Sequence, residues 1–160
     1  MKKLNIGGGQ TKIKDFINID LCDEADIKHD LREPLPFGDG EVEEIMAVHV
    51  IESFYKWEFL EVIKDWARVL KGKLTIEFTD LDTCCKMYLS DNEDDKKYGK
   101  WGFYGDQDKI CDPIVYHKYD YTIKELEEIL KDVGFTVEEI TKEGVLHNKK
   151  RDSRIICSII

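Results

Sequence analysis

The stretch Lys2–Lys12, "KKLNIGGGQTK", places three consecutive glycines directly after a short apolar segment that is typical of a β-strand. Glycine allows a backbone to turn where a side chain would clash, and it allows another group to approach the backbone closely. A tight turn alone would explain Gly7, Gly8 and Gly9 as well as a bound ligand would. The residues around this stretch decide between the two.

Strand-like and helix-like segments alternate along the chain, which predicts an α/β fold with a mostly parallel sheet. The predicted strands are Lys3–Ile6, Phe16–Asp20, Ile27–His29, Glu44–His49, Lys73–Phe78, Thr136–Ile140 and Arg154–Ile159. One helix is predicted from Tyr55 to Leu70, with Gly72 as a stop. A second helix is predicted to begin at Thr122, in the capping box "TIKE", and to end at Gly134.

The links between the first strands are too short for crossover helices. No full helix fits between Gly9 and Asp20, and the prolines and glycines of Arg32–Glu41 exclude a long helix there. One face of the sheet should therefore be poorly covered, and a homodimer is one way to bury it. The short loop before Arg154–Ile159 predicts that the last strand runs antiparallel, because a parallel return requires a crossover.

The composition is that of one globular domain, over residues 1–160, with 42% hydrophobic and 36% charged residues. No apolar run approaches a membrane span, and no apolar stretch follows Met1 as in a signal peptide, so we expect a cytoplasmic protein without a membrane partner. The net charge of -10 makes nucleic acid a poor partner. The basic run His147–Arg154 is interpreted as a solvated turn, and the acidic run Ser90–Lys97 as an exposed loop.

The sequence shows no complete metal site and no disulfide framework. The cysteines lack Cys-x-x-Cys spacing and are interpreted as reduced thiols. They are Cys22, Cys84, Cys85, Cys111 and Cys157. His49 and Glu52 form a His-x-x-Glu pair, which is half of a metal site, but no second half is visible, and we expect no metal.

The junction after the first strand of an open α/β sheet is a common ligand site. A dinucleotide would require Gly-x-Gly-x-x-Gly and a helix N-terminus for its pyrophosphate, but Lys12 occupies the third glycine position. A cofactor without phosphates requires only a close backbone approach. Asp20 could then accept both ribose hydroxyls, and Asp30 an adenine amino group with Leu31 packed on the ring. This chemistry fits S-adenosylmethionine better than NAD.

Five stretches match a known family: "LNIGGG", "FINIDL", "HDLREPLPFGDGEVEEIMAVHVIESF", "WARVLKGKLTIEFTDLD" and "HKYDYTIKELEEILKDVGF". They resemble small class I S-adenosylmethionine-dependent methyltransferases over Leu4 to Phe135. The resemblance implies a Rossmann-like seven-stranded sheet and a methyltransferase that uses S-adenosylmethionine. It implies that the glycines Gly7, Gly8 and Gly9 cradle the cofactor, that Asp20 binds the ribose, that Asp30 and Leu31 hold the adenine, and that His49 lies near the methionine part.

Asp80 and His117 are candidates for a catalytic base, although Asp80 could equally cap a helix and His117 could equally be structural. The resemblance suggests a small-molecule or glycan-like acceptor. Two alternatives stay open: an NAD-type oxidoreductase, and a non-catalytic cofactor-binding or interaction domain, which the changes to Asn5 and Ser53 at family positions would suit.

The aromatic residues of "KWGFYGDQ" also allow two interpretations. Trp101, Phe103 and Tyr104 could form the floor of a substrate pocket, or they could pack beneath a long loop.

Overall fold

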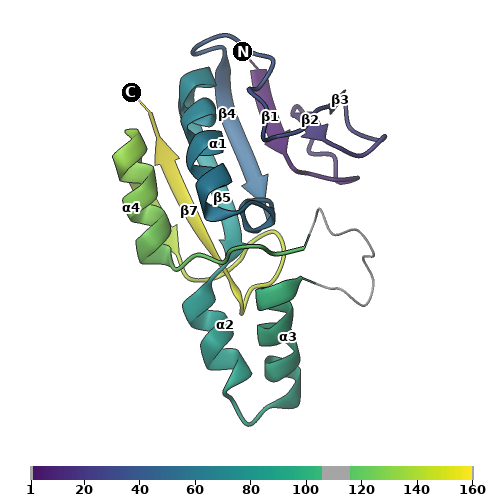
Figure 1. The fold of residues 1–160 in the computed structure, drawn as a ribbon, viewed down its shortest axis with the longest axis vertical. Helices are drawn as coiled ribbons and strands as arrows, with labels where there is room; N and C mark the ends of the chain where they lie inside the picture. Colours follow the sequence, from purple (N-terminus) through teal and green to yellow (C-terminus); the bar gives the residue numbers. More distant parts are fainter. Residues whose placement is uncertain (1, 106–115, 160) are drawn as a thin grey trace.

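A seven-stranded sheet organises the chain, in the order β3-β2-β1-β4-β5-β7-β6 (Figure 1). The computed structural model describes residues 2–105 and 116–159. The strands are β1 (Lys2–Ile6), β2 (Ile17–Asp20), β3 (Ile27–Lys28), β4 (Val42–Val48), β5 (Leu70–Thr79), β6 (Thr136–Thr141) and β7 (Asp152–Ser158). Strands β1 to β5 pair in parallel, whereas β7 is antiparallel to both of its neighbours. The predicted α/β class, strand number and antiparallel last strand are confirmed.

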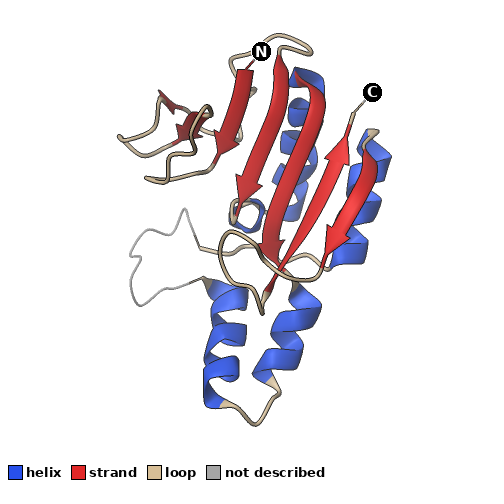
Figure 2. Cartoon of the chain, turned by 180° about the vertical axis from the view of Figure 1, so that it is seen from behind, coloured by secondary structure: helices blue, strands red, loops and turns tan. Residues whose placement is uncertain are grey.

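Two long helices, α1 (Lys56–Val69) and α4 (Ile123–Val133), cover the same face of the sheet, and Figure 2 shows the strands unobstructed from the other side. A single 3-10 turn, η1 (Ile51–Ser53), precedes α1. The buried stripe of α1, which includes Phe59, Ile63 and Trp66, packs in the core between helix and sheet. In the described part of the chain, the links between β1 and β4 contain no helix, as predicted from their length.

The face without helices is polar rather than apolar. Lys3, Glu44 and Lys73 are in register across three neighbouring strands. The Glu44 carboxylate lies 2.8 Å from the Lys3 ammonium and 3.1 Å from that of Lys73. Parallel sheets are normally covered on both faces, and here a ladder of ion pairs makes part of one face compatible with water. A homodimer through this face stays a prediction.

The junction between α1 and β5 differs from the sequence-based expectation. Helix α1 passes directly into the strand, with Leu70 already extended at ψ 139°. Gly72 lies inside β5 and does not stop the helix. A Cβ at this position would overlap the backbone carbonyl oxygen of Glu43 on β4. Gly72 is therefore required by a close approach between strands, and the strand begins three residues earlier than predicted.

An antiparallel pair of helices, α2 (Leu81–Tyr88) and α3 (Glu93–Tyr104), projects away from the sheet (Figures 1 and 2). The prediction of a loop over Ser90–Lys97 is wrong, because α3 occupies most of it. The Asn92 side chain accepts a hydrogen bond from the Asp95 backbone N–H at 3.0 Å and caps the helix. The acidic residues of the first turn interact favourably with the positive end of the helix dipole.

The cysteines are free thiols where the structure describes them, namely Cys22, Cys84, Cys85 and Cys157, and Cys111 lies outside the described residues. Burial raises the pKa of the Cys84 and Cys157 thiols to about 12. Within residues 2–105 and 116–159, no helix has both the length and the apolar character needed to cross a bilayer.

Candidate functional site

A cavity of about 540 Å³ lies where the carboxyl ends of the parallel strands meet. Ligands bind at this edge in open α/β sheets, in cavities of this size. Residues predicted from the sequence contribute to its walls: Gly7, Asp20, Asp30, Leu31, His49 and His117. The other predicted residues, Gly8, Gly9 and Asp80, are not among the described residues that line it.

Packing within the protein accounts for the first two glycines. Gly7 has φ 66°, and a Cβ there would overlap the side chain of Val50. At Gly8, a Cβ would overlap the side chains of Asn5 and Asn18, which are hydrogen-bonded to each other at 3.0 Å. These two glycines therefore bring β1 close to neighbouring parts of the fold, and Gly7 also presents its backbone to the cavity.

The third glycine holds Asp20 in place. Gly9 has φ 55°, and its backbone N–H donates to Asp20 Oδ2 at 2.8 Å. The Cys22 N–H donates to the other carboxylate oxygen at 3.0 Å. A carboxylate oxygen can accept more than one hydrogen bond, so Asp20 is oriented at the cavity wall and keeps acceptor capacity for a ligand.

Asp30 is engaged by a residue that sequence analysis did not consider. The guanidinium of Arg32 donates from Nε to Asp30 Oδ1 at 2.9 Å and from its NH2 group to Oδ2 at 2.7 Å. These hydrogen bonds lower the pKa of Asp30. Asp30 is thus a fixed, ionised acceptor at the cavity wall, and Arg32 also lines the cavity.

His49 follows β4 in a left-handed backbone conformation, with φ 52°. Its Nε2 lies 2.7 Å from Asp152 Oδ2, and its Nδ1 lies 3.5 Å from Glu52 Oε1. Burial alone would lower the pKa of His49, but the carboxylates of Asp152 and Glu52 raise it to about 9. The strained backbone and the two buried carboxylates fix this ring at the cavity wall.

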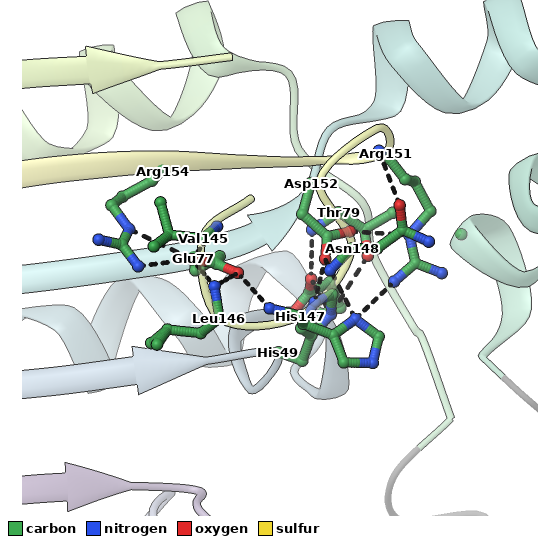
Figure 3. A network of polar contacts seen from close by, with 12 residues as sticks. His49, Glu77, Thr79, Val145, Leu146, His147, Asn148, Arg151, Asp152 and Arg154 are labelled. Atoms are coloured by element: carbon green, nitrogen blue, oxygen red, sulfur yellow. Dashed lines mark hydrogen bonds and ion pairs between the residues drawn. The ribbon is translucent and has the colours of Figure 1, made fainter. Parts of the chain in front are cut away.

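The loop between β6 and β7 folds onto the helix-free face and supplies residues that the sequence interpretation missed. Figure 3 shows that the Glu77 carboxylate, on β5, accepts hydrogen bonds from the backbone N–H groups of Val145, Leu146 and His147. The shortest N···O distances are 3.0, 2.9 and 2.9 Å, respectively. The Arg154 guanidinium bonds the same carboxylate at 2.8 Å. Glu77 thereby anchors the loop that carries His147 to the cavity.

Asp152, at the start of β7, is the centre of a polar cluster (Figure 3). It is fully buried, and its Oδ2 accepts from the Asn148 N–H at 2.8 Å and lies 3.1 Å from His147 Nδ1. Arg151 Nε donates to Oδ1 at 2.8 Å. The interpretation of His147–Arg154 as a solvated turn is therefore wrong, since Arg151 and Asp152 are buried. An available signal was Asp152 itself, a single acid within a basic run just before a predicted strand.

His117 lies at the cavity wall opposite the strand ends. Its Nδ1 lies 2.6 Å from the Gly102 carbonyl oxygen and 3.0 Å from Asp120 Oδ1. Burial would lower the pKa of His117, but Asp120 and Glu52 raise it. With Nδ1 engaged by two acceptors, Nε2 is the nitrogen available to a ligand.

Asp80 is placed differently from His117. It precedes α2, is 4% exposed, and accepts a hydrogen bond from Thr83 Oγ1 at 2.5 Å. Its side chain does not cap the helix backbone. The two residues proposed as bases from the sequence are therefore not brought together at the cavity.

The aromatic residues of α3 divide between two environments. Trp101 lines the cavity together with Tyr98. Phe103 instead packs edge-on against Tyr88 of α2, with ring centroids 6.0 Å apart, and Tyr104 is exposed. Trp101 therefore lies where the pocket interpretation placed it, whereas Phe103 packs against a helix and not beneath a loop.

This chain is similar to known proteins in its three-dimensional structure. No protein-family model and no curated protein sequence matches it. A SAM-dependent methyltransferase from Methanosarcina mazei is 20% identical, with a TM-score of 0.73 over 99% of this chain and 92% of that one. A SAM-dependent methyltransferase from Archaeoglobus fulgidus is 15% identical, with a TM-score of 0.65 over 98% of this chain and 85% of that one. A SAM-dependent methyltransferase from Aquifex aeolicus is 17% identical, with a TM-score of 0.60 over 100% of this chain and 82% of that one. The chain has the Rossmann-like fold of these proteins.

Proposed function

We propose that the protein is an S-adenosylmethionine-dependent methyltransferase that acts on a small-molecule or glycan-like acceptor. The observation that carries the proposal is Asp20, which two backbone N–H groups hold at the wall of the cavity, at the end of β2. The structural neighbours named as SAM-dependent methyltransferases support the same activity. Asp30 and Leu31, which line the same cavity, are also consistent with a ligand that contains adenosine.

The acidic end of the cavity suits a nucleoside. Asp20 offers a charged acceptor for the ribose hydroxyls, and Leu31 offers an apolar surface for the adenine ring. Asp30 offers an acceptor for the adenine amino group, which would compete with the hydrogen bonds that Arg32 makes to both carboxylate oxygens. Hydrogen bonds to charged groups contribute about 1.5–3 kcal/mol each, which is enough to orient the nucleoside.

The turn after β1 disfavours a dinucleotide. A pyrophosphate is normally bound by backbone N–H groups at a helix N-terminus, and the described link between β1 and β2 contains no helix. An acid at the end of β2 could bind the ribose of NAD as well, so the missing helix N-terminus carries the distinction. The NAD-type oxidoreductase is therefore the weaker candidate.

His117 is the residue best placed to accept a proton from an acceptor hydroxyl. S-adenosylmethionine, when bound, supplies an electrophilic methyl group for in-line transfer. Asp120 orients the His117 ring through Nδ1 and increases the basicity of Nε2. Alignment of the acceptor within an enclosed cavity provides most of the rate acceleration in such a reaction. Asp80 has no comparable access, so we assign it no role in proton transfer.

The proposal is tested by calorimetry of the purified protein with S-adenosylhomocysteine, and with NAD⁺ as the matched comparison. Stoichiometric binding of S-adenosylhomocysteine and no binding of NAD⁺ is the expected result. Preference for NAD⁺ would overturn the proposal in favour of an oxidoreductase. Binding of S-adenosylhomocysteine without methyl transfer to any of a panel of small hydroxylated and glycan acceptors would favour the non-catalytic alternative.

A further inference from the structure

A second group of residues at the cavity resembles a metal centre. His49 comes from the end of β4, His147 from the loop between β6 and β7, and Asp152 from the start of β7. One ligand atom of each residue lies within 4.8 Å of the other two. We propose that these three residues bind a divalent first-row transition-metal ion such as Zn²⁺.

The atoms converge in the way that a metal centre requires. His49 Nε2 and His147 Nδ1 lie 2.7 and 3.1 Å from the same oxygen, Asp152 Oδ2. An ion at their centre would replace the protons that the rings now share with this oxygen. Two imidazole nitrogens and one carboxylate oxygen are a common ligand set for Zn²⁺ and related ions. Separations near 3 Å require only a small expansion to hold such an ion.

The residues behind the ligands support the assignment. The other nitrogen of His49, Nδ1, faces Glu52 Oε1 at 3.5 Å and Thr79 Oγ1 at 3.4 Å. A metal-bound histidine usually has such a carboxylate behind it, which fixes the tautomer and the ring orientation. Glu52 is itself fixed, because its Oε1 accepts a hydrogen bond from the Thr79 N–H at 2.7 Å. Its Oε2 is buried and has no partner among the described residues.

The charges of the cluster leave room for a cation. Two fully buried carboxylates, Glu52 and Asp152, face His49. Arg151 supplies one compensating charge through Asp152 Oδ1, and its NH2 group lies 3.4 Å from His147 Nδ1. Buried carboxylates are stable when they are paired or bind a metal. A divalent ion at Oδ2 would supply the positive charge that a proton on His49 supplies in its absence.

The position of the site indicates its use, an assignment that rests on the proposed methyltransferase function. His49, His147 and the neighbouring Asn148 all line the 540 Å³ cavity. An ion with three protein ligands keeps a position open to solvent or substrate, as catalytic metal centres do. An acceptor hydroxyl oxygen in that position would be held facing the cofactor site and would lose its proton more readily. This proposal departs from the expectation of no metal that was drawn from the sequence alone.

The experiment measures metal binding in the absence of cofactor and acceptor. Protein stripped with a chelator is titrated with Zn²⁺ by calorimetry and with Co²⁺ by visible absorption. We expect one ion per chain, with cobalt ligand-field bands and no thiolate-to-cobalt charge-transfer band. The absence of that band separates this site from the free cysteines, of which Cys85 is exposed.

His147→Ala is the informative variant, because the side chain is 59% exposed and its loss leaves the core intact. Removal of a supporting residue costs 10–100-fold in metal affinity, and we expect the loss of a direct ligand to weaken Zn²⁺ binding by at least about 100-fold. His29→Ala is the matched control, since the only hydrogen bond described for the His29 side chain is to the Glu33 carbonyl oxygen, and the residue lies outside the cluster. It should bind Zn²⁺ as the wild type does.

Equal Zn²⁺ affinity of the wild type and His147→Ala would overturn the proposal, as would a wild type that binds no stoichiometric ion. The histidines would then serve only as hydrogen-bond donors to Asp152. Calorimetry with S-adenosylhomocysteine on the same stripped protein tests the proposed function independently. Metal binding without cofactor binding would preserve the site and remove its assignment to methyl transfer.

Discussion

The carboxylate of Glu77 accepts a hydrogen bond from the backbone N–H of His147 at 2.9 Å, across 70 residues of chain. This bond ties β5, an inner strand of the sheet, to the loop between β6 and β7. Because the same loop carries His147 to the cavity, the geometry of the site depends on a carboxylate that does not itself line it. Glu77 therefore has a positioning role on the helix-free face of the sheet.

Glu77→Gln should destabilise the protein by about 1.5–3 kcal/mol, the contribution of hydrogen bonds to a charged group. The amide would present N–H groups to backbone donors that need an acceptor, and Arg154 would lose its ion pair. Urea unfolding measures the change. Glu44→Gln on the same face is the matched control, and it should cost less than about 1 kcal/mol because it removes only pairs with half-exposed lysines. An equal loss in both variants would contradict the positioning role of Glu77.

The sequence predicted the sheet and one half of the site for local reasons. Asp20 and Asp30 stand at or just after the ends of short strand-like segments that are visible in the sequence. Because these strands are parallel, their ends meet at one edge of the sheet. The missed half depends on contacts between distant segments. His147 and Asp152 reach His49 only because β7 inserts between β5 and β6 and because Glu77 fixes the loop. No local pattern specifies such contacts.

The missed helix pair has a similar explanation. Helix α3 contains Gly99 and Gly102, residues that normally disfavour a helix interior. Both are buried against α2, and a Cβ at Gly102 would overlap the sulfur of Cys84. Close packing between the helices thus overrides local propensity. Asn92 and the acidic first turn were a visible start signal, whereas the partner helix was not visible in the sequence.

Gly99→Ala tests this packing. In an isolated helix the substitution would stabilise by about 1 kcal/mol. Here the new Cβ would lie 2.7 Å from both the Cys84 carbonyl oxygen and the Tyr88 backbone nitrogen, which cannot move without disturbing α2. Overpacking costs about 1–3 kcal/mol, so we expect a net loss of up to about 2 kcal/mol. Urea unfolding and amide hydrogen exchange in α2 and α3 measure it.

Gly38→Ala is the control for Gly99→Ala. Its Cβ would meet only the Glu41 side chain at an ordinary distance of 3.6 Å, and we expect little change in stability. Stabilisation by Gly99→Ala would show that α2 and α3 are not in close contact in solution.

A pH-dependent contribution is expected where α4 meets α1. Burial opposes ionisation of Glu125, but hydrogen bonds from Lys56 and from Tyr119, the latter at 2.6 Å, lower its pKa. A lowered folded-state pKa contributes stability above the unfolded value, and that stability is lost as the pH falls through the folded value. Glu125→Gln should therefore cost about 0.5–1 kcal/mol at pH 7 and progressively less below about pH 4.5.

Chemical unfolding of Glu125→Gln at several pH values gives this difference directly. Glu128→Gln on the same helix is the control, because Glu128 is 65% exposed and 3.9 Å from Lys124, and it should have the smaller effect at pH 7. A cost of Glu125→Gln that is the same at pH 3.5 as at pH 7 would be inconsistent with the lowered pKa.

Asp20→Asn tests the assignment of the nucleoside end of the cavity. The variant keeps the shape of the side chain but loses a charged acceptor for ribose hydroxyls, so S-adenosylhomocysteine should bind about ten- to a hundred-fold more weakly. The variant also places an amide N–H group against the backbone donor of Gly9 or Cys22. We therefore expect a loss of stability of about 1 kcal/mol, and the variant must be shown to be folded at the temperature of the titration. Asp82→Asn on the exposed side of α2 should leave the affinity unchanged.

A change in the ligand distinguishes the loss of the ribose contact from a disturbance of the turn formed by the three glycines. The wild type should bind the 2′-deoxy analogue of S-adenosylhomocysteine more weakly than the parent ligand, because Asp20 then lacks one hydroxyl donor. In Asp20→Asn, the two ligands should differ much less, since the charged acceptor is already gone. This double-mutant cycle isolates the pairwise interaction. If the 2′-deoxy penalty is the same in both proteins, Asp20 does not bind the ribose. Gly7 and Gly8 would then serve only to pack β1 against its neighbours, and Gly9 only to orient Asp20.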